Sequence, residues 1–256
     1  MKDTLTKTTN GGRRNATATG AMLSDPACLG NAPRDAGERL FDPDYWRNRG
    51  ELAEVTGGRG SAWFIESSER HWMLRHYRRG GFIARLSQDR YVWAGEHRVR
   101  AFAEWRLLDV LSRRGLPVPA PVAARYVRTG SWYRCDLITQ RVALAQPLSA
   151  ALGACALPES IWRAVGDAVA KLHAAGVDHA DLNAHNLLLD AHGAVNVIDF
   201  DRGRLRAPGG LRGTGAWTSR NLRRLKHSLD KIASGMPSDR SSARTWEWFL
   251  AGYRGN

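Results

Sequence analysis

The spacing of apolar residues changes near residue 142, and this change constrains the fold more than any other feature of the sequence. Before it, apolar residues gather in short runs that predict strands, at residues 51–56, 62–65, 71–77, 122–127 and 132–138. After it, apolar residues recur at helical spacing, at residues 158–175, 216–232 and 242–253. We therefore expect an α+β chain in which a strand-rich lobe precedes a helical lobe.

This pattern divides the chain into a tail and two lobes. Residues 1–37 are rich in Thr, Gly, Asn and Ala and have few large apolar side chains, so we expect a disordered N-terminal tail. Residues 38–141 form the predicted first lobe, which contains one helix at residues 96–114. Residues 142–256 form the predicted second lobe, and the linker candidate lies near residues 140–147.

The chain carries a large excess of positive charge, with 38 Lys and Arg residues against 25 Asp and Glu residues. Such an excess indicates an anionic partner, which can be a phosphorylated substrate, an acidic membrane surface or a nucleic acid. No apolar run reaches the roughly 18 residues that a membrane-spanning helix needs. The sequence therefore predicts no transmembrane segment.

Three polar residues of the second lobe have the types and the order that phosphoryl transfer requires. Asp181 lies in the segment His-Ala-Asp-Leu-Asn-Ala-His-Asn, which ends at Asn186, and Asp199 lies in Val-Ile-Asp-Phe-Asp. A carboxylate such as that of Asp181 can orient an acceptor hydroxyl and take its proton. Asn186 and Asp199 offer the hard oxygen atoms that bind a divalent cation on nucleotide phosphates. Because a predicted hairpin joins the two segments, we expect the three side chains to converge.

The two segments resemble the H-R-D-x-x-x-x-N loop and the D-F-G motif of the protein-kinase superfamily. The resemblance implies a bilobal protein-kinase-like fold, with a small antiparallel-sheet lobe that carries one helix and a mainly helical second lobe. It also implies an ATP site made of Gly58 and Gly60 in a phosphate-covering turn, Arg75 in place of the usual third-strand lysine, Glu104 as its helix partner, and Gln140 and Val142 beside the adenine. Arg78, Arg79 and Arg85 are alternative substitutes for that lysine.

The chain departs from protein kinases at three places. Ala180 replaces the loop arginine, so this position offers no cation to a phosphorylated activation loop. Asp201 replaces the glycine of D-F-G, and it is either a further metal ligand or a support for neighbouring groups. No A-P-E follows, and residues 202–226 carry seven arginines, one lysine and no acid. We therefore expect a small-molecule or lipid-linked acceptor rather than a protein.

A narrower resemblance covers roughly residues 41–230. The chain reads Phe-Asp-Pro-Asp-Tyr-Trp at 41–46, Arg-His-Tyr-Arg-Arg-Gly-Gly at 75–81 and Leu-Pro-Val-Pro at 116–119. Together with the segments 58–64, 179–186 and 198–203, these motifs are similar to those of the 3-deoxy-D-manno-octulosonic acid (Kdo) kinases of Gram-negative bacteria. The resemblance implies transfer of the γ-phosphate of ATP, with Mg²⁺, to the 4-hydroxyl of a Kdo sugar on a lipid A precursor during lipopolysaccharide inner-core biosynthesis. It also implies a peripheral protein at the cytoplasmic face of the inner membrane, with no nucleic acid partner.

Basic side chains suit both an anionic acceptor and an anionic membrane surface, because arginine binds phosphate and carboxylate groups well. The candidates for this basic face are Arg78, Arg79, Arg202, Arg204, Arg223 and Arg224. Inside the loop, Asn183 and His185 either stabilise the backbone or contact the acceptor. Two alternative functions remain open: a kinase of a core heptose, another small molecule or a protein, and a catalytically silent kinase fold that binds nucleic acid through its basic face.

Overall fold

The computed structural model describes residues 12–30, 32–33, 35–54, 62–78, 89–206, 215–235 and 243–255. The chain forms two compact units, of which the first comprises Met1–Asp109 with Ala120–Arg141 and the second Val110–Pro119 with Val142–Asn256. The predicted lobe boundary, between residues 141 and 142, is also a point at which the chain passes from the first unit to the second. Residues 110–119, which the sequence placed in the first lobe, belong to the second unit.

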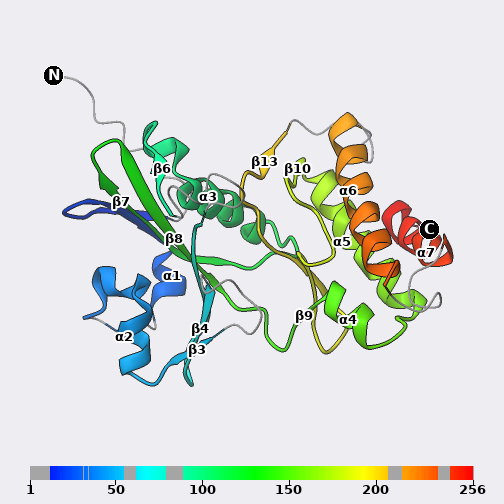
Figure 1. The fold of residues 1–256 in the computed structure, drawn as a ribbon, viewed down its shortest axis with the longest axis horizontal. Coiled ribbons are helices and arrows are strands. Elements are labelled where there is room, and N and C mark those ends of the chain that lie inside the picture. Colours follow the sequence, from blue (N-terminus) through cyan, green and yellow to red (C-terminus); the bar gives the residue numbers. More distant parts are fainter. Residues whose placement is uncertain are drawn as a thin grey trace. The chain divides into compact units, whose positions relative to one another are not determined.

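The first unit is built on one antiparallel sheet in the order β1-β2-β7-β8-β5-β4-β3, with β6 paired to β8 (Figure 1). Its strands are β1 (Arg13–Ala16), β2 (Gly20–Ser24), β3 (Leu52–Glu54), β4 (Ala62–Glu66), β5 (His71–His76), β6 (Tyr91–Val92), β7 (Pro121–Thr129) and β8 (Trp132–Gln140). Its helices are α1 (Pro26–Leu29), α2 (Pro43–Asn48) and α3 (Arg100–Arg113), with short 3-10 turns η1 (Gly37–Phe41) and η3 (Glu96–Arg98). The strands predicted from 51 to 138 and the helix predicted within 96–114 are all present.

Strand β5 separates two different environments, because successive side chains of a strand point to opposite faces. Trp72 and Leu74 are buried on one face, in a core with Leu40 of η1 and Trp46 of α2. Arg75, the residue after Leu74, belongs to the other face and reaches α3. The alternation along β5 therefore sends Trp72 and Leu74 into the core and Arg75 toward the helix.

Part of the predicted disordered tail is ordered, and the prediction is wrong for the described residues from 12 onward. β1 and β2 form a hairpin, and β2 pairs with β7 along Gly20–Ser24. Ala21 and Leu23 are buried there. A short apolar run that is too weak to fold alone is stabilised by an existing sheet edge, which supplies backbone partners and a core. Residues 1–11 lie outside the described residues.

The second unit is mainly helical. Its helices are α4 (Leu148–Ala154), α5 (Glu159–Ala174), α6 (Ala216–Ala233) and α7 (Ala243–Arg254), and its short strands form the sheets β10-β13 and β12-β11-β9. These strands are β9 (Gln146–Pro147), β10 (Val177–Asp178), β11 (Leu187–Leu189), β12 (Val195–Val197) and β13 (Arg204–Leu205). The described residues thus confirm the predicted α+β class, with an antiparallel sheet first and helices after it.

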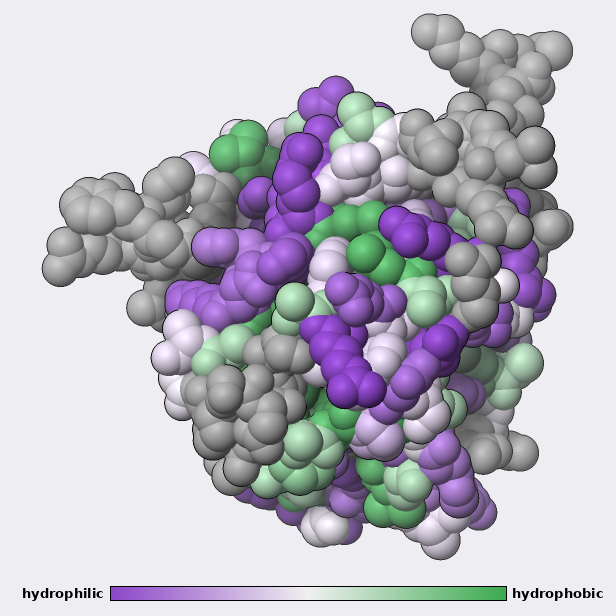
Figure 2. Space-filling model, turned by 90° about the vertical axis from the view of Figure 1, so that its right-hand side faces the viewer, coloured by the Kyte–Doolittle hydropathy of each residue, from purple (hydrophilic) through white to green (hydrophobic). Residues whose placement is uncertain are grey.

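Helices α5 and α7 pack at very short range, and glycine makes this possible. A Cβ atom on Gly166 of α5 would lie 2.1 Å from the carbonyl oxygen of Phe249, and one on Gly252 of α7 would lie 2.1 Å from that of Arg163. Only residues without a side chain allow the two backbones to approach so closely. Figure 2 shows that, on the side of this unit that carries α6 and α7, hydrophilic residues are widespread and hydrophobic ones are visible only in patches. No helix among the described residues is long and apolar enough to cross a membrane.

His173 connects three helices of the second unit and is 2% exposed. Its Nδ1 hydrogen-bonds the hydroxyl of Tyr253 on α7 at 2.7 Å, and its ring packs edge-on against Trp217 of α6. Burial lowers the pKa of His173 from 6.5 to about 4, and the nearby charge of Asp178 offsets only part of this effect.

The buried ring of His173 predicts a pH dependence of stability. Between pH 6.5 and about pH 4 the unfolded chain binds a proton at His173 and the folded chain does not, so stability falls as the pH falls through this window. By about pH 4 this residue should lower the free energy of unfolding by about 3 kcal/mol. The measurement is the free energy of unfolding in urea at about pH 7 and at about pH 4.5. His173→Asn should remove the part of the difference between the two values that His173 causes. Tyr253→Phe keeps the buried ring and should retain it; an unchanged pH dependence in His173→Asn would contradict the assignment.

Candidate active site

The 179–186 loop follows β10 and is folded around two asparagine side chains. Oδ1 of Asn183 accepts hydrogen bonds from the backbone N–H groups of His185 at 2.9 Å and Asn186 at 3.2 Å. The Nδ2 groups of Asn183 and Asn186 both donate to the carbonyl oxygen of Asp181, at 3.1 and 2.9 Å. The backbone of Asp181 is thereby fixed, while its side chain remains exposed.

Two neighbouring helices anchor the same loop. The backbone N–H of Ala184 donates to the hydroxyl oxygen of Ser228 on α6 at 3.2 Å, and the carbonyl of Ala184 accepts from the backbone N–H of Ser149 on α4 at 3.2 Å. Nδ1 of His185 hydrogen-bonds the Ser149 hydroxyl at 2.8 Å. Of the two roles left open for His185 and Asn183, these contacts favour the stabilisation of the loop.

His179 joins the start of the loop to the segment that carries Asp199. Its Nδ1 accepts the backbone N–H of Asp181 at 3.2 Å, so the ring proton lies on Nε2, which donates to the carbonyl of Ile198 at 3.0 Å. The ring is 2% exposed and packs on Phe200 at a centroid distance of 4.8 Å. Burial lowers the pKa of His179, which favours this neutral form.

The predicted metal ligands, Asn186 and Asp199, are joined through their backbones. The N–H of Ile198 donates to the carbonyl of Asn186 at 3.0 Å. Nδ2 of Asn186 is engaged by Asp181, so its Oδ1 is the oxygen with which it can bind a ligand. Asp199 has a φ of +62°, a conformation that is rare for residues other than glycine and that is often found at functional sites. Two hard oxygen donors thus lie on segments that hydrogen bonds hold together.

A metal site here would depend on more than protein carboxylates. Among the described residues, no group of three or more His, Cys, Asp or Glu side chains is arranged to hold a metal ion. Asn186 and Asp199 fit a cation that takes its remaining oxygen ligands from water and phosphate, as Mg²⁺ does. Asp201, two residues after Asp199, is half-buried.

In the first unit, Arg75 forms the predicted pair with Glu104. Nη2 of Arg75 lies 2.5 Å from Oε2 of Glu104, whose side chain is 2% exposed. The hydroxyl of Tyr77 donates to the same carboxylate oxygen and accepts from Nη2 of Arg75 at 3.0 Å. Burial, and next the charge of Glu104, raise the pKa of Tyr77 well above its ordinary value.

Tyr77 is a member of this group that the sequence analysis missed. Because residues two apart on an extended chain share a face, the spacing of Arg75 and Tyr77 is the signal that could have revealed it. A buried carboxylate needs both an opposite charge and hydrogen-bond donors, and the arginine and the tyrosine supply them.

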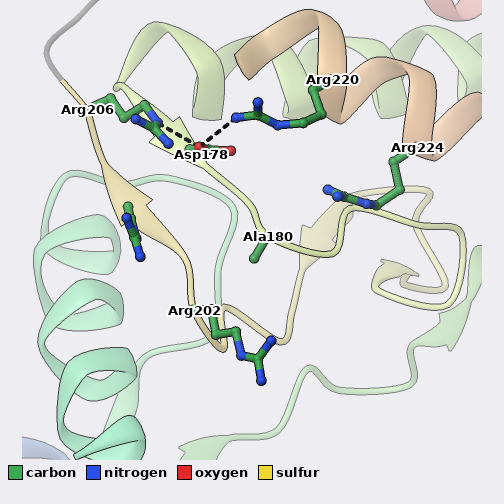
Figure 3. Close-up of a pocket in the computed structure, with 7 residues that line it drawn as sticks. Asp178, Ala180, Arg202, Arg206, Arg220 and Arg224 are labelled. Carbon is green, nitrogen blue, oxygen red and sulfur yellow. Dashed lines mark hydrogen bonds and ion pairs between the residues drawn. The ribbon is translucent and has the colours of Figure 1, made fainter. Parts of the chain in front are cut away.

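The other residues predicted for the nucleotide site and the basic face lie in different places. Gly58, Gly60 and Arg79 lie outside the described residues. Gln140 ends β8, and its backbone N–H donates to the carbonyl of Ala120 at 2.8 Å; Val142 follows it in the chain. Arg78 is exposed. Arg202, Arg204 and Arg224 line one cavity of the second unit, whereas Arg223 is exposed on α6 and is not part of its lining (Figure 3).

Comparison with known proteins identifies the family. The model of the lipopolysaccharide kinase (Kdo/WaaP) family matches residues 43–253. A 3-deoxy-D-manno-octulosonic acid kinase of Xanthomonas euvesicatoria pv. vesicatoria (strain 85-10) is 46% identical over 215 residues, which cover 83% of this chain and 81% of that protein. A protein of the same name from Xylella fastidiosa (strain 9a5c) is 48% identical over 213 residues, with the same coverage of both chains. The chain therefore belongs to the lipopolysaccharide kinase (Kdo/WaaP) family.

Proposed function

We propose that this protein transfers the γ-phosphate of ATP to the 4-hydroxyl of a Kdo sugar on a lipid A precursor, in lipopolysaccharide inner-core biosynthesis. The observation that carries the proposal is the hydrogen-bonded arrangement of Asp181, Asn186 and Asp199 around His179. Relatives that are 46–48% identical over most of the chain bear the name of Kdo kinase, which supports this acceptor over a heptose or a protein. The same comparison does not favour a silent fold that binds nucleic acid.

In the second unit, the exposed carboxylate of Asp181 orients the acceptor hydroxyl and takes its proton. Its backbone is held by His179 on one side and by two asparagine amides on the other, so it is fixed before the acceptor arrives. Asn186 and Asp199 hold Mg²⁺, which when bound neutralises charge on the nucleotide phosphates.

In the first unit, Arg75 binds ATP phosphates, and Glu104 with Tyr77 holds its guanidinium in place. Gly58 and Gly60, which lie outside the described residues, are the candidates for a turn that covers the phosphates. Gln140 at the end of this unit contacts the adenine, as does Val142, the residue with which the second unit resumes. These groups position the reactants and stabilise charge. Positioning and charge stabilisation supply most of the acceleration in phosphoryl transfer.

The protein also associates peripherally with the anionic cytoplasmic face of the inner membrane. Basic residues near such a surface contribute about 1 kcal/mol each. Of the predicted basic face, Arg78 and Arg223 are exposed and lie outside the cavity that Arg202, Arg204 and Arg224 line, so we assign the membrane contact to these two. Arg79, next to Arg78 in the sequence, lies outside the described residues.

The acceptor and the base are tested together by mass spectrometry. A Kdo-bearing lipid A precursor incubated with the protein, ATP and Mg²⁺ should gain the mass of one phosphate. Asp181→Asn keeps the size of the side chain and should lower the rate by about 100-fold or more, because it removes the proton acceptor. Asp167→Asn, an exposed change on α5, is the matched control and should react as the unsubstituted protein does. Turnover by Asp181→Asn near that of the control would disprove the assignment of the base.

The buried pair in the first unit separates a phosphate-binding role from a structural one. Arg75→Ala should lower kcat/KM for ATP by about 100-fold, and it should also destabilise the unit by about 3 kcal/mol because it leaves Glu104 buried without its ion pair. Arg75→Lys should keep part of both.

The double variant Arg75→Met with Glu104→Gln removes both charges, so it should recover most of the stability in urea unfolding. Its activity should stay low, because it lacks the cation that we assign to the phosphates. If activity returned with stability, Arg75 would be structural, and another arginine would bind the phosphates.

A further inference from the structure

A cavity of about 250 Å³ in the second unit is lined by five arginines, with Asp178 and Ala180 (Figure 3). Of the five, only Arg202, Arg204 and Arg224 were singled out by the sequence; the other two are Arg206 and Arg220. Although this arginine pocket adjoins the 179–186 loop, neither the phosphate-binding Arg75 nor the metal ligands take part in it. It therefore needs an explanation of its own.

The short β10-β13 sheet and helix α6 build the arginine pocket. In the antiparallel pairing of these two strands, Asp178 of β10 lies opposite Arg204 of β13. The backbone N–H of Arg206 donates to the carbonyl of Gly176 at 2.8 Å. Gly176 has a φ of +80°, and a Cβ atom there would lie 2.4 Å from the carbonyl oxygen of Arg206. This close approach requires glycine at position 176, and it holds β13 and Arg206 against the segment that leads into the 179–186 loop.

Helix α6 supplies the opposite wall. Arg220 and Arg224 are four residues apart, so their side chains lie on one face of the helix, where like charges repel each other. Arg223 lies on the same helix and is exposed, but it is not part of the lining. Such a pair of like charges destabilises a helix by a few tenths of a kcal/mol, and an anion beside both side chains would offset this cost.

The described lining of the pocket supplies little negative charge to these arginines. Asp178 is the only acid among the described lining residues. Its Oδ2 lies 2.6 Å from Nε of Arg206 and 3.6 Å from Nη2 of Arg220, and its Oδ1 accepts from Asn221 at 2.8 Å. Figure 3 shows both arginines turned toward it. One carboxylate is therefore shared by two arginines and a buried amide.

The other three arginines lack such a partner within the described residues, where no carboxylate pairs with Arg202, Arg204 or Arg224. Figure 3 places Ala180 between Arg202 and Arg224. Its methyl group leaves space at this point, and the next residue is Asp181. An acceptor whose hydroxyl meets Asp181 can thus place a second, anionic group among these arginines.

We infer that the arginine pocket binds a phosphate monoester carried by the acceptor itself, distinct from the phosphate that is transferred. This inference rests on the proposed function, since it assigns a second contact to the same acceptor. Several guanidinium groups match the charge and the several oxygens of a phosphate dianion better than a single carboxylate. The cavity is near the lower size limit of ligand pockets, about 300 Å³, so it suits a phosphate with part of its sugar and not a whole lipid.

The test compares two acceptors, a Kdo-bearing lipid A precursor with its phosphates and the same molecule after their removal. The unsubstituted protein should prefer the phosphorylated form in kcat/KM. Arg204→Ala and Arg224→Ala should each reduce this preference by about tenfold, mainly through a higher KM, because a charged hydrogen bond is lost in ground state and transition state alike. Arg204→Lys should keep part of it.

Arg244→Ala is the matched control, because it removes an equal charge from an exposed position of α7 in the same unit. It should leave the preference intact. An equal loss in this control, or an unchanged preference in both pocket variants, would overturn the inference. So would variants that lose binding to vesicles containing phosphatidylglycerol while they keep the acceptor preference, since the pocket would then serve the membrane surface.

A binding measurement makes the result independent of turnover. The probe is the phosphorylated disaccharide of lipid A, without acyl chains and without Kdo. It should bind the full chain in calorimetry, and it should bind the Arg224→Ala variant about tenfold more weakly. Binding that does not change on removal of the phosphates would contradict the inference. If the unsubstituted protein phosphorylated neither acceptor but still bound this probe through Arg224, the proposed function would fail and the phosphate pocket would stand.

Discussion

A buried, neutral imidazole is the constraint on which the candidate site depends. His179 accepts a backbone hydrogen bond from Asp181 and donates one to Ile198, so a single ring sets the distance between the loop and the segment that ends in Asp199. A charged ring could not accept from Asp181, and burial disfavours that charged form. The packing that buries His179 against Phe200 therefore also maintains the arrangement of the polar groups.

The pairing of charges differs between the Arg75–Glu104 group of the first unit and the arginine pocket of the second. In the first, the carboxylate of Glu104 is almost completely buried, and an arginine and a tyrosine satisfy it, as a low-dielectric environment requires. In the second, the arginines around Asp178 outnumber the available carboxylate, and water can reach them. The first arrangement orients one guanidinium at a fixed place. The second leaves positive charge that Asp178 offsets only in part. In the functions proposed above, the two groups of arginines therefore recognise different phosphates.

The sequence predicted those parts of the fold that local pattern determines. The alternation of β5 and the helical spacing of α5 are visible in a single segment, and the types and order of Asp181, Asn186 and Asp199 indicated phosphoryl transfer before any geometry was known. The strand β2 was missed because its stability comes from the edge of β7, about a hundred residues away in the chain. The roles of Asn183 and His185 also depend on contacts that spacing alone does not determine.

The arginine pocket shows how tertiary structure can relocate a chemical function. Ala180 stands where the protein-kinase loop carries an arginine, so the sequence predicts no cation at this position for a phosphorylated activation loop. In the folded chain, Ala180 instead adjoins arginines from β13 and α6. A single long side chain within the loop would occupy the space that a ligand needs, whereas arginines on the surrounding walls keep the space open and surround it with donors. The alanine and the distant arginines are therefore parts of one arrangement, and neither can be understood from its own segment of the sequence.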